Sequence, residues 1–478
     1  MPNPEHLALL LSAEWNAWRA RNANVTPDLT DAGLSGQDLS GKDLKRADLS
    51  RAELEGTSLA AADLSRAVLV EAKLEGASAP GAIFENCVLD FLDFSKAFLV
   101  GARFRSASLQ SCSFVGANLA GADLTRTHCD GSNLMEANLA GATISEVSFR
   151  GVKTTGAHFD GADLSRSLFE GVKLARGSFP NANFSGANLK TADLTGADLR
   201  RAKFVGAILR QSALNAANCE GADFTEADLE LATAVETDFS GACFDRAKLR
   251  KAELKRAIFL DASGEKVSFA ESKMTEVDLR SARFESANLQ GADLSKAILS
   301  HTNLRVYSFV GARFANCDAS EAQAQGVNFS GADLSLANFR LANLKRANLS
   351  GCRAFDANLS GSLLVGTNFT GATLQEADLR FARAIGADFT RANLAGADFA
   401  NADLSEAKFK RTKIWGATAR RVKSPKGWGM LLAVSTMFFR AKQKKTKVAD
   451  MKEEERKKRI AVLEAEADQK APHLTGRR

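Results

Sequence analysis

Residues 187–196 read ANLKT ADLTG, which is two copies of a five-residue unit that repeats along most of this chain. From Leu29 to Ala419, every fifth position holds Leu, Phe, Ile or Met in 68 of 79 cases. Two residues before each of them the chain carries mostly Ala, with Cys, Ser, Thr or Val as substitutes. A period of five fits neither an α-helix nor a flat β-strand. The pattern therefore predicts a repeat whose unit forms one side of a coil.

Each unit has an inward and an outward set of positions. The large residue and the small residue two positions earlier point to the same side of an extended segment, so we expect both in the core. The other three residues then face water, and the Gly or charged residue that ends many units suits a corner. Stacked coils would pair the backbone groups of neighbouring coils. Examples of the predicted core positions are Leu189, Leu194, Phe204, Phe224 and Phe244.

The unit resembles the pentapeptide-repeat family of bacterial proteins, and the match covers about 395 of the 478 residues. The resemblance implies an all-β solenoid, namely a right-handed, four-sided β-helix with four pentapeptides per coil. The 79 units then give about twenty coils and a rod roughly 95 Å long at a strand spacing of ~4.8 Å. The sequence itself supports four sides only in part. Central Phe residues recur eleven times at the spacing of four units, ten times at the spacing of two units and three times in adjacent units.

Two shorter segments flank the repeat, which we place at residues 27–421. Residues 1–26 predict a short capping helix, because Asn3 followed by Pro and Glu is a typical helix start. One apolar stripe then follows at helical spacing, made of Leu7, Leu11, Trp15 and Trp18. Residues 422–478 predict a helical tail that is disordered at its end.

The distribution of charge separates the repeat from the tail. Residues 27–421 hold 46 Lys and Arg against 48 Asp and Glu, whereas residues 422–478 hold 15 against 7. The four faces of the repeat sum to 0, −1, −4 and +3. Some members of the family mimic DNA and protect topoisomerases from antibiotics, which requires a strongly acidic surface, since duplex DNA carries one charge per ~1.7 Å. DNA mimicry is therefore kept only as an alternative, and we expect no nucleic-acid partner.

No pattern of residues predicts an enzyme, a metal centre or a cofactor site. The five His residues do not recur with Ser, Cys or acids at a catalytic or metal-binding spacing, and no glycine-rich phosphate loop is present. Six of the seven Cys residues occupy inward positions, and no CxxC pair occurs. The unpaired cysteines and an N-terminus without a basic signal-peptide start predict a cytoplasmic protein.

The tail contains a candidate interaction site. Residues 428–439 are a nearly unbroken apolar run between Lys and Arg residues, and as a helix they span ~18 Å, too short for a bilayer core of ~30 Å. Two interpretations stay open. The run caps the last coil, or it docks on a protein partner or on an anionic membrane surface through residues 423–447, as a secreted effector would. The docking candidates are Trp428, Leu431, Leu432, Phe438 and Phe439.

A second candidate interaction site consists of large apolar residues at positions that are otherwise polar or small. Its members are Val68, Val88, Phe91, Leu92 and Phe98. An exposed apolar patch usually marks an interface. The other interpretation is a local bulge that turns these residues inward, or a cover provided by the N-terminal helix.

A third feature is an uncharged stripe that recurs at every fourth unit, made of Asn288, Ser308, Asn328, Asn348 and Asn368 with Gly at the matching corners. It is either a ladder of side-chain amides that stabilises stacked coils or a surface that packs against a partner or a second copy, as in a homodimer. Taken together, the residues predict a rigid, non-enzymatic scaffold that binds a protein partner through its faces and its tail.

Overall fold

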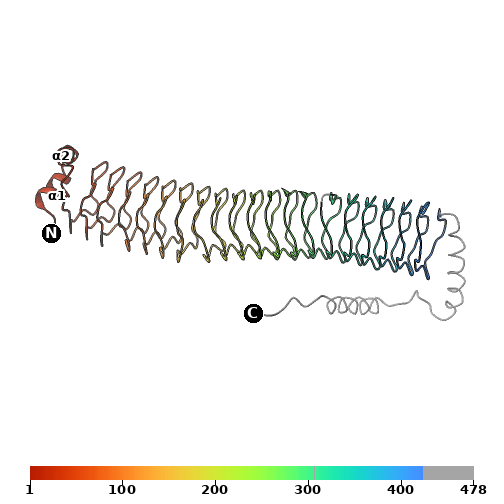
Figure 1. The fold of residues 1–478 in the computed structure, drawn as a ribbon. Coiled ribbons are helices and arrows are strands. Elements are labelled where there is room, and N and C mark those ends of the chain that lie inside the picture. The colour runs from red at the N-terminus through yellow and green to blue at the C-terminus, as the bar shows by residue number, and fades with distance from the viewer. Residues whose placement is uncertain (306, 424–478) are drawn as a thin grey trace, which may run out of the picture.

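The computed structural model describes residues 1–305 and 307–423, which form an elongated solenoid of stacked coils (Figure 1). Two short helices, α1 (Pro4–Leu10) and α2 (Trp15–Arg21), lie at its N-terminal end. The strands β1 (Ser263–Glu265) and β2 (Arg283–Glu285) pair in parallel. Elsewhere in the described coils the extended segments are so short that they pair as isolated parallel bridges.

The bridges join residues that are 20 positions apart, from Asp28 with Asp48 to Asp403 with Lys423. One coil therefore contains four pentapeptides. The bridging residue directly precedes the large inward residue. The N–H group of one donates to the next coil, and the N–H group of the other donates to the preceding coil. The Leu194 N–H donates to the Ala213 carbonyl of the next coil at 2.7 Å. The N–H of its neighbour Asp193 donates to the preceding coil at 2.9 Å, so the backbone is satisfied on both sides.

The core is a column of large side chains closed in by small ones. Phe rings one coil apart stack face to face, with ring centroids 5.0 Å apart for Phe184 and Phe204 and 4.9 Å for Phe204 and Phe224. Rings half a coil apart meet edge to face across the interior, as Phe84 and Phe94 do at 6.2 Å and 82°. Both separations give favourable ring contacts, which explains why spacings of two and four units recur almost equally in the sequence. The five example positions are fully buried: Leu189, Leu194, Phe204, Phe224 and Phe244.

Several polar substitutes for Ala at the small inward position bond to the coil before them, and others, such as Ser212, bond to a carbonyl in their own turn. Thr57 donates to the Leu34 carbonyl at 2.8 Å, and Ser132 donates to the Leu109 carbonyl at 2.6 Å. In each case the acceptor lies 23 residues earlier. A buried hydroxyl that keeps a partner costs little, and this explains how Ser, Thr and Cys replace Ala without disturbing the stack.

The corner of each unit is a tight turn. The Ala197 N–H donates to the Leu194 carbonyl at 3.0 Å, and Gly196 between them has a φ of 65°. Many corners hold a residue other than Gly in the same left-handed conformation, including Ala216 at a φ of 55°. This conformation costs an L-residue roughly 1–2 kcal/mol, and the hydrogen bonds of the stacked coils hold it in place.

We expect Ala216→Gly to raise the free energy of unfolding by about 1 kcal/mol, because Gly adopts a positive φ without the clash of a Cβ. The matched control is Ala213→Gly in the same unit, whose residue bridges in an extended conformation and should lose about 0.5–1 kcal/mol. Guanidinium unfolding followed by circular dichroism measures both. Equal effects in the two variants would contradict the interpretation of the corner.

The prediction of one continuous N-terminal helix is wrong, because the chain folds as α1 and α2. Asn3 caps α1 as expected and accepts a hydrogen bond from the Glu5 N–H at 2.9 Å. The Ser12 hydroxyl donates to the Leu9 carbonyl at 2.8 Å and accepts from the Glu14 N–H at 3.2 Å. These local bonds compete with helix continuation. Consequently the stripe shifts: Leu10 is buried, whereas Leu11 is exposed.

Helix α2 bonds to the open edge of the first coil. Trp15 is fully buried, and its indole N–H donates to the Asp43 carbonyl at 2.8 Å. The Asp43 N–H has no preceding coil to bond to and donates instead to Asn16 Oδ1 at 2.8 Å. Arg19, also buried, donates to the Lys45 carbonyl at 2.9 Å. The helix thus occupies hydrogen-bonding groups that would otherwise form an open β-edge.

Candidate functional site

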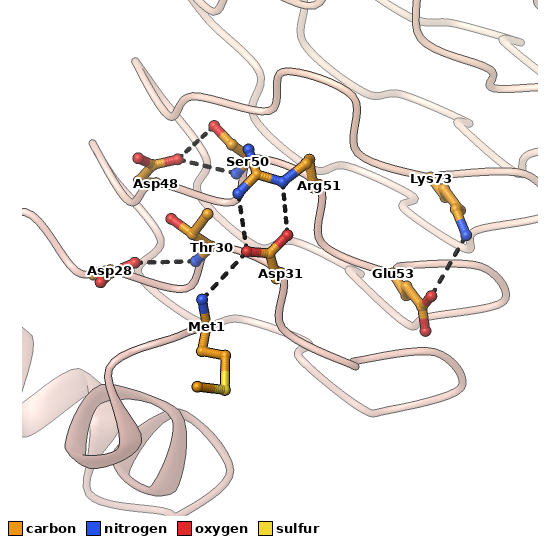
Figure 2. A network of polar contacts seen from close by, with 9 residues as sticks. All are labelled: Met1, Asp28, Thr30, Asp31, Asp48, Ser50, Arg51, Glu53 and Lys73. Carbon is orange, nitrogen blue, oxygen red and sulfur yellow. Dashed lines mark hydrogen bonds and ion pairs between the residues drawn. The ribbon is translucent and has the colours of Figure 1, made fainter.

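Successive coils neutralise each other's charges at the surface. Arg51 forms a bidentate pair with Asp31 one coil earlier, with Nε–Oδ1 and Nη2–Oδ2 distances of 2.7 and 2.9 Å (Figure 2). Lys73 pairs with Glu53 in the same way at 3.4 Å. The same arrangement continues along the rod, for example from Arg126 to Glu146 at 2.8 Å. Many charges of the repeat are therefore paired between neighbouring coils rather than isolated.

The bidentate hydrogen bonds from Arg51 lower the pKa of Asp31 to about 2, and the N-terminal amino group, 3.3 Å away, adds to this shift. Since the folded-state pKa lies below the unfolded one, the pair stabilises the fold above pH ~4 and loses this contribution as the pH falls towards 2. We expect an NMR titration to give a pKa near 2 for Asp31. In Arg51→Ala it should return towards the ordinary value of 3.8, and an unchanged pKa in that variant would contradict the assignment.

The apolar candidates form a patch on two neighbouring coils. Val68 and Val88 bridge each other directly and are both exposed. Val70 is exposed beside Val68, and the corner residue Phe91 is 79 % exposed. The ladder passes through Val68 and Val88 without a break in register. These four residues, here called the valine patch, therefore do not form the bulge that was considered as an alternative.

Two of the predicted members do not belong to the valine patch. Leu92 is only 2 % exposed, because it occupies a small inward position and its side chain enters the core. Phe98 is 45 % exposed, but its bridge partner is Ser78 rather than a member of the patch. Two units separate Phe98 from Val88, and two units are half a coil, which places them on opposite faces.

The candidates Trp428, Leu431, Leu432, Phe438 and Phe439 lie outside the described residues. Within the described part of the chain, neither helix has the length or apolar character needed to cross a bilayer.

The uncharged stripe contains a ladder of amides. Asn348 donates to Asn328 Oδ1 at 3.1 Å, and Asn368 donates to Asn348 Oδ1 at 3.1 Å. Each of these oxygens also accepts the N–H of the residue two positions later in its own turn, for example Ser350 at 3.1 Å. No hydrogen bond between side chains joins Asn288 to Ser308 in the described chain. The amide ladder therefore covers Asn328, Asn348 and Asn368, which are three of the five residues of the stripe.

Burial lowers the reactivity of the cysteine thiols. Burial raises the pKa of the Cys87 and Cys112 thiols to about 12, and the two thiols donate to the Leu64 and Leu89 carbonyls at 3.0 and 2.9 Å. A thiol with so high a pKa is a poor nucleophile. Residues 1–305 and 307–423 contain no group of three His, Cys, Asp or Glu side chains that could hold a metal ion.

A basic hollow of about 580 Å³ on one face is a feature that the sequence reasoning missed. Its lining combines cations with amide and apolar side chains: Arg305, Gln325, Gly326, Lys345, Arg346, Val365, Arg383 and Ile385. The charge pattern becomes visible when the pentapeptides are grouped by face, that is, when every fourth unit is compared. The five successive pentapeptides of this face, from 302–306 to 382–386, contain four cations and no acid. Summing the charge of the whole face hid this local excess.

Comparisons with known proteins agree with the architecture. The family model described as pentapeptide repeats matches eleven stretches between residues 28 and 423, and the model of a pentapeptide repeat region matches residues 102–179. No curated protein matches the chain.

Several solved structures of pentapeptide-repeat proteins are similar to the chain. HetL, involved in heterocyst differentiation regulation in the cyanobacterium Nostoc sp. strain PCC 7120, is 25% identical over 54% of this chain and 92% of its own, with a TM-score of 0.19. QnrB1, a plasmid-mediated fluoroquinolone resistance protein, is 20% identical over 52% and 97%, with a TM-score of 0.17. A protein of the Arabidopsis thaliana thylakoid lumen is 23% identical over 35% and 71%, with a TM-score of 0.14. Since the family models cover nearly all of residues 28–423, the chain belongs to the pentapeptide-repeat family.

Proposed function

We propose that this protein is a rigid, non-enzymatic scaffold that binds a protein partner. The observation that supports this most directly is the ladder, which runs in one register from Asp28 to Lys423. Each coil between the two ends of the ladder is bonded to both neighbours, so side chains on one face keep fixed spacings along the rod. Such a surface suits the docking of partners at defined positions.

The proposal includes the finer features of the architecture and location. The rod is right-handed and has about twenty coils, α1 and α2 cap its first coil, and residues 27–421 are its structural unit. The hydrogen bonds of Trp15 and Asn16 to residues of the first coil support the cap. We place the protein in a bacterial cytoplasm, in keeping with seven cysteines that are all unpaired.

The topoisomerase-protecting alternative requires an acidic field along the rod. Ion pairs between coils work against such a field, because they neutralise the acids that would represent phosphates. Glu226 pairs with Arg246 at 2.6 Å, and Glu271 pairs with Arg250 at 2.7 Å. A scaffold with docking faces is therefore the function that the surface supports best.

Attachment through the tail is the part of the proposal that one variant tests. We expect the double substitution Leu432→Glu/Phe438→Glu to release the full-length protein from its partner or from anionic liposomes, because it places two charges in an apolar run. Bracketing lysines near an anionic surface contribute about 1 kcal/mol each. Co-sedimentation with liposomes and a pull-down measure the release, and thermal unfolding measures stability. The expected result is lost binding with an unchanged melting temperature.

The outcome separates the two interpretations of the tail. A lower melting temperature with binding intact would show that residues 428–439 cap the last coil, and attachment through them would be ruled out. The control, Lys444→Glu/Lys447→Glu, reverses two charges outside the apolar run. It should weaken liposome binding only through the salt-dependent electrostatic contribution.

A further inference from the structure

The basic hollow brings together four cations on one face of neighbouring coils. Arg305, Lys345, Arg346 and Arg383 are exposed and form no ion pair with any residue in 1–305 or 307–423. Elsewhere cations on neighbouring coils repeatedly find an acid, as Arg256 does with Glu236 and Glu276 at 2.9 and 2.8 Å. Four unpaired cations in one hollow repel each other, and an anionic ligand would relieve that repulsion.

Few acidic side chains lie close enough to these four cations to reduce their mutual repulsion. Asp403 bridges Arg383 at the C-terminal edge of the hollow, but Ser405 hydrogen-bonds it, and its nearest cation is Lys423 at 3.9 Å. At the N-terminal edge the same face carries Glu285, one coil before Arg305, and on the preceding face Glu321 lies 3.4 Å from His301. The uncharged stripe covers the next face, where pentapeptides 287–291 to 367–371 contain no charged residue. Over these coils one face therefore carries cations without acids and the next face carries no charge, so the positive field is concentrated at the hollow.

The floor of the hollow indicates a ligand that also carries hydrogen-bond donors. Gln325 Nε2 donates to Gln323 Oε1 at 3.5 Å, and Asn343 donates to the same oxygen at 3.3 Å. Gln325 Oε1 is buried and has no hydrogen-bond partner among the described residues. An unsatisfied acceptor is unfavourable, and a small rotation of this side chain would offer it to a donor. Bare phosphate at neutral pH supplies mainly acceptors.

The walls add apolar area between the cations. Val365 and Ile385 line the hollow on neighbouring coils and are half-buried. Gly326 leaves space, since a Cβ there would meet nothing within 4 Å. Peptides combine all the matching groups, namely carboxylates for the Arg side chains, backbone N–H groups for Gln325, and an apolar side chain for Val365 and Ile385.

We propose that the basic hollow binds an acidic segment of a partner protein, with its carboxylates on Arg305, Lys345, Arg346 and Arg383. This inference rests on the proposed scaffold function and assigns one docking position on it. Charge complementarity of this kind contributes most to the rate and specificity of association. Binding should therefore weaken steeply with added salt.

Fluorescence anisotropy with the full-length protein tests the proposal. The probe is a labelled decapeptide in which Glu alternates with Ser around one central Leu, and its control has Gln in place of Glu. We expect the acidic peptide to bind at least tenfold more tightly than the Gln peptide. In Arg346→Glu/Arg383→Glu this preference should disappear. The matched variant Arg176→Glu/Arg201→Glu changes the net charge equally at exposed residues several coils away and should bind within twofold of wild type.

Three results would overturn the proposal. Equal weakening in the two double variants would show a general effect of net charge. Equal binding of the Gln peptide would show that the carboxylates are not recognised. Tighter binding of tripolyphosphate or of duplex DNA than of the acidic peptide, dependent on Arg346 and Arg383, would assign the hollow to phosphate groups. Circular dichroism confirms that each variant is folded. A wild-type protein that captures a partner through its tail but ignores the acidic peptide would sink this inference and leave the scaffold function standing.

Discussion

Replacing Phe204 by alanine should lower the free energy of unfolding by about 3–5 kcal/mol. Phe204 is fully buried, and its ring stacks on Phe184 and Phe224 with interplanar angles of 1° and 2°. The substitution removes both ring contacts and leaves a cavity that the hydrogen-bonded coils above and below cannot close. Ring stacking contributes to this loss in addition to the burial of apolar area. Guanidinium unfolding followed by circular dichroism measures the loss.

Two control variants define the effect. Phe204→Leu keeps an apolar side chain of the kind that most units carry at this position, so it should cost much less than Phe204→Ala. Lys203→Ala changes the exposed neighbour in the same unit and should stay within about 0.5 kcal/mol of the wild type. A loss below about 1 kcal/mol for Phe204→Ala would mean that the core can collapse around a missing ring.

The second large effect is expected at the N-terminal end, where Trp15→Ala should also cost about 3–5 kcal/mol. Trp15 is fully buried, and its indole N–H satisfies the Asp43 carbonyl at 2.8 Å. The variant loses the packing and leaves that carbonyl on an open coil edge. Because an open edge can pair with another chain, we expect size-exclusion chromatography to show added oligomers together with the lower stability.

Leu11→Ala is the control for this prediction, because Leu11 lies between α1 and α2 and is exposed. It should leave both stability and the elution volume unchanged. A monomeric Trp15→Ala variant of normal stability would show that α2 does not protect the first coil.

The period of five could predict the solenoid because it constrains the inside of every coil in the same way. A large residue such as Leu194 and a small residue such as Ala192 must alternate inward wherever the coil continues. The break between α1 and α2 was not predictable from the apolar stripe, since hydrogen bonds of Ser12 decide it. The helical spacing of apolar residues indicates which face is buried. It does not indicate where a side chain competes with the helix for backbone hydrogen bonds.

The surface was harder to predict than the core, because sequence neighbours on the chain are not neighbours on a face. Phe98 follows Phe91 closely in sequence but lies on the opposite face from Val88. Conversely, Arg305 and Lys345 are two full coils apart along the chain and line the same hollow. Only the spacing of four units, which the bridges establish, sorts outward residues into the faces on which partners would dock.

The four-unit spacing also governs how such a chain can change in length. In residues 1–305 and 307–423 the bridges join each coil to the coils directly before and after it. Gain or loss of a whole coil would therefore shift all later residues along the axis and leave each on its own side. Gain or loss of a single pentapeptide would preserve the core equally well but rotate everything downstream by a quarter turn. The valine patch and the basic hollow would then face new directions relative to each other, so the duplication of one pentapeptide could re-aim one binding surface without altering any residue in it.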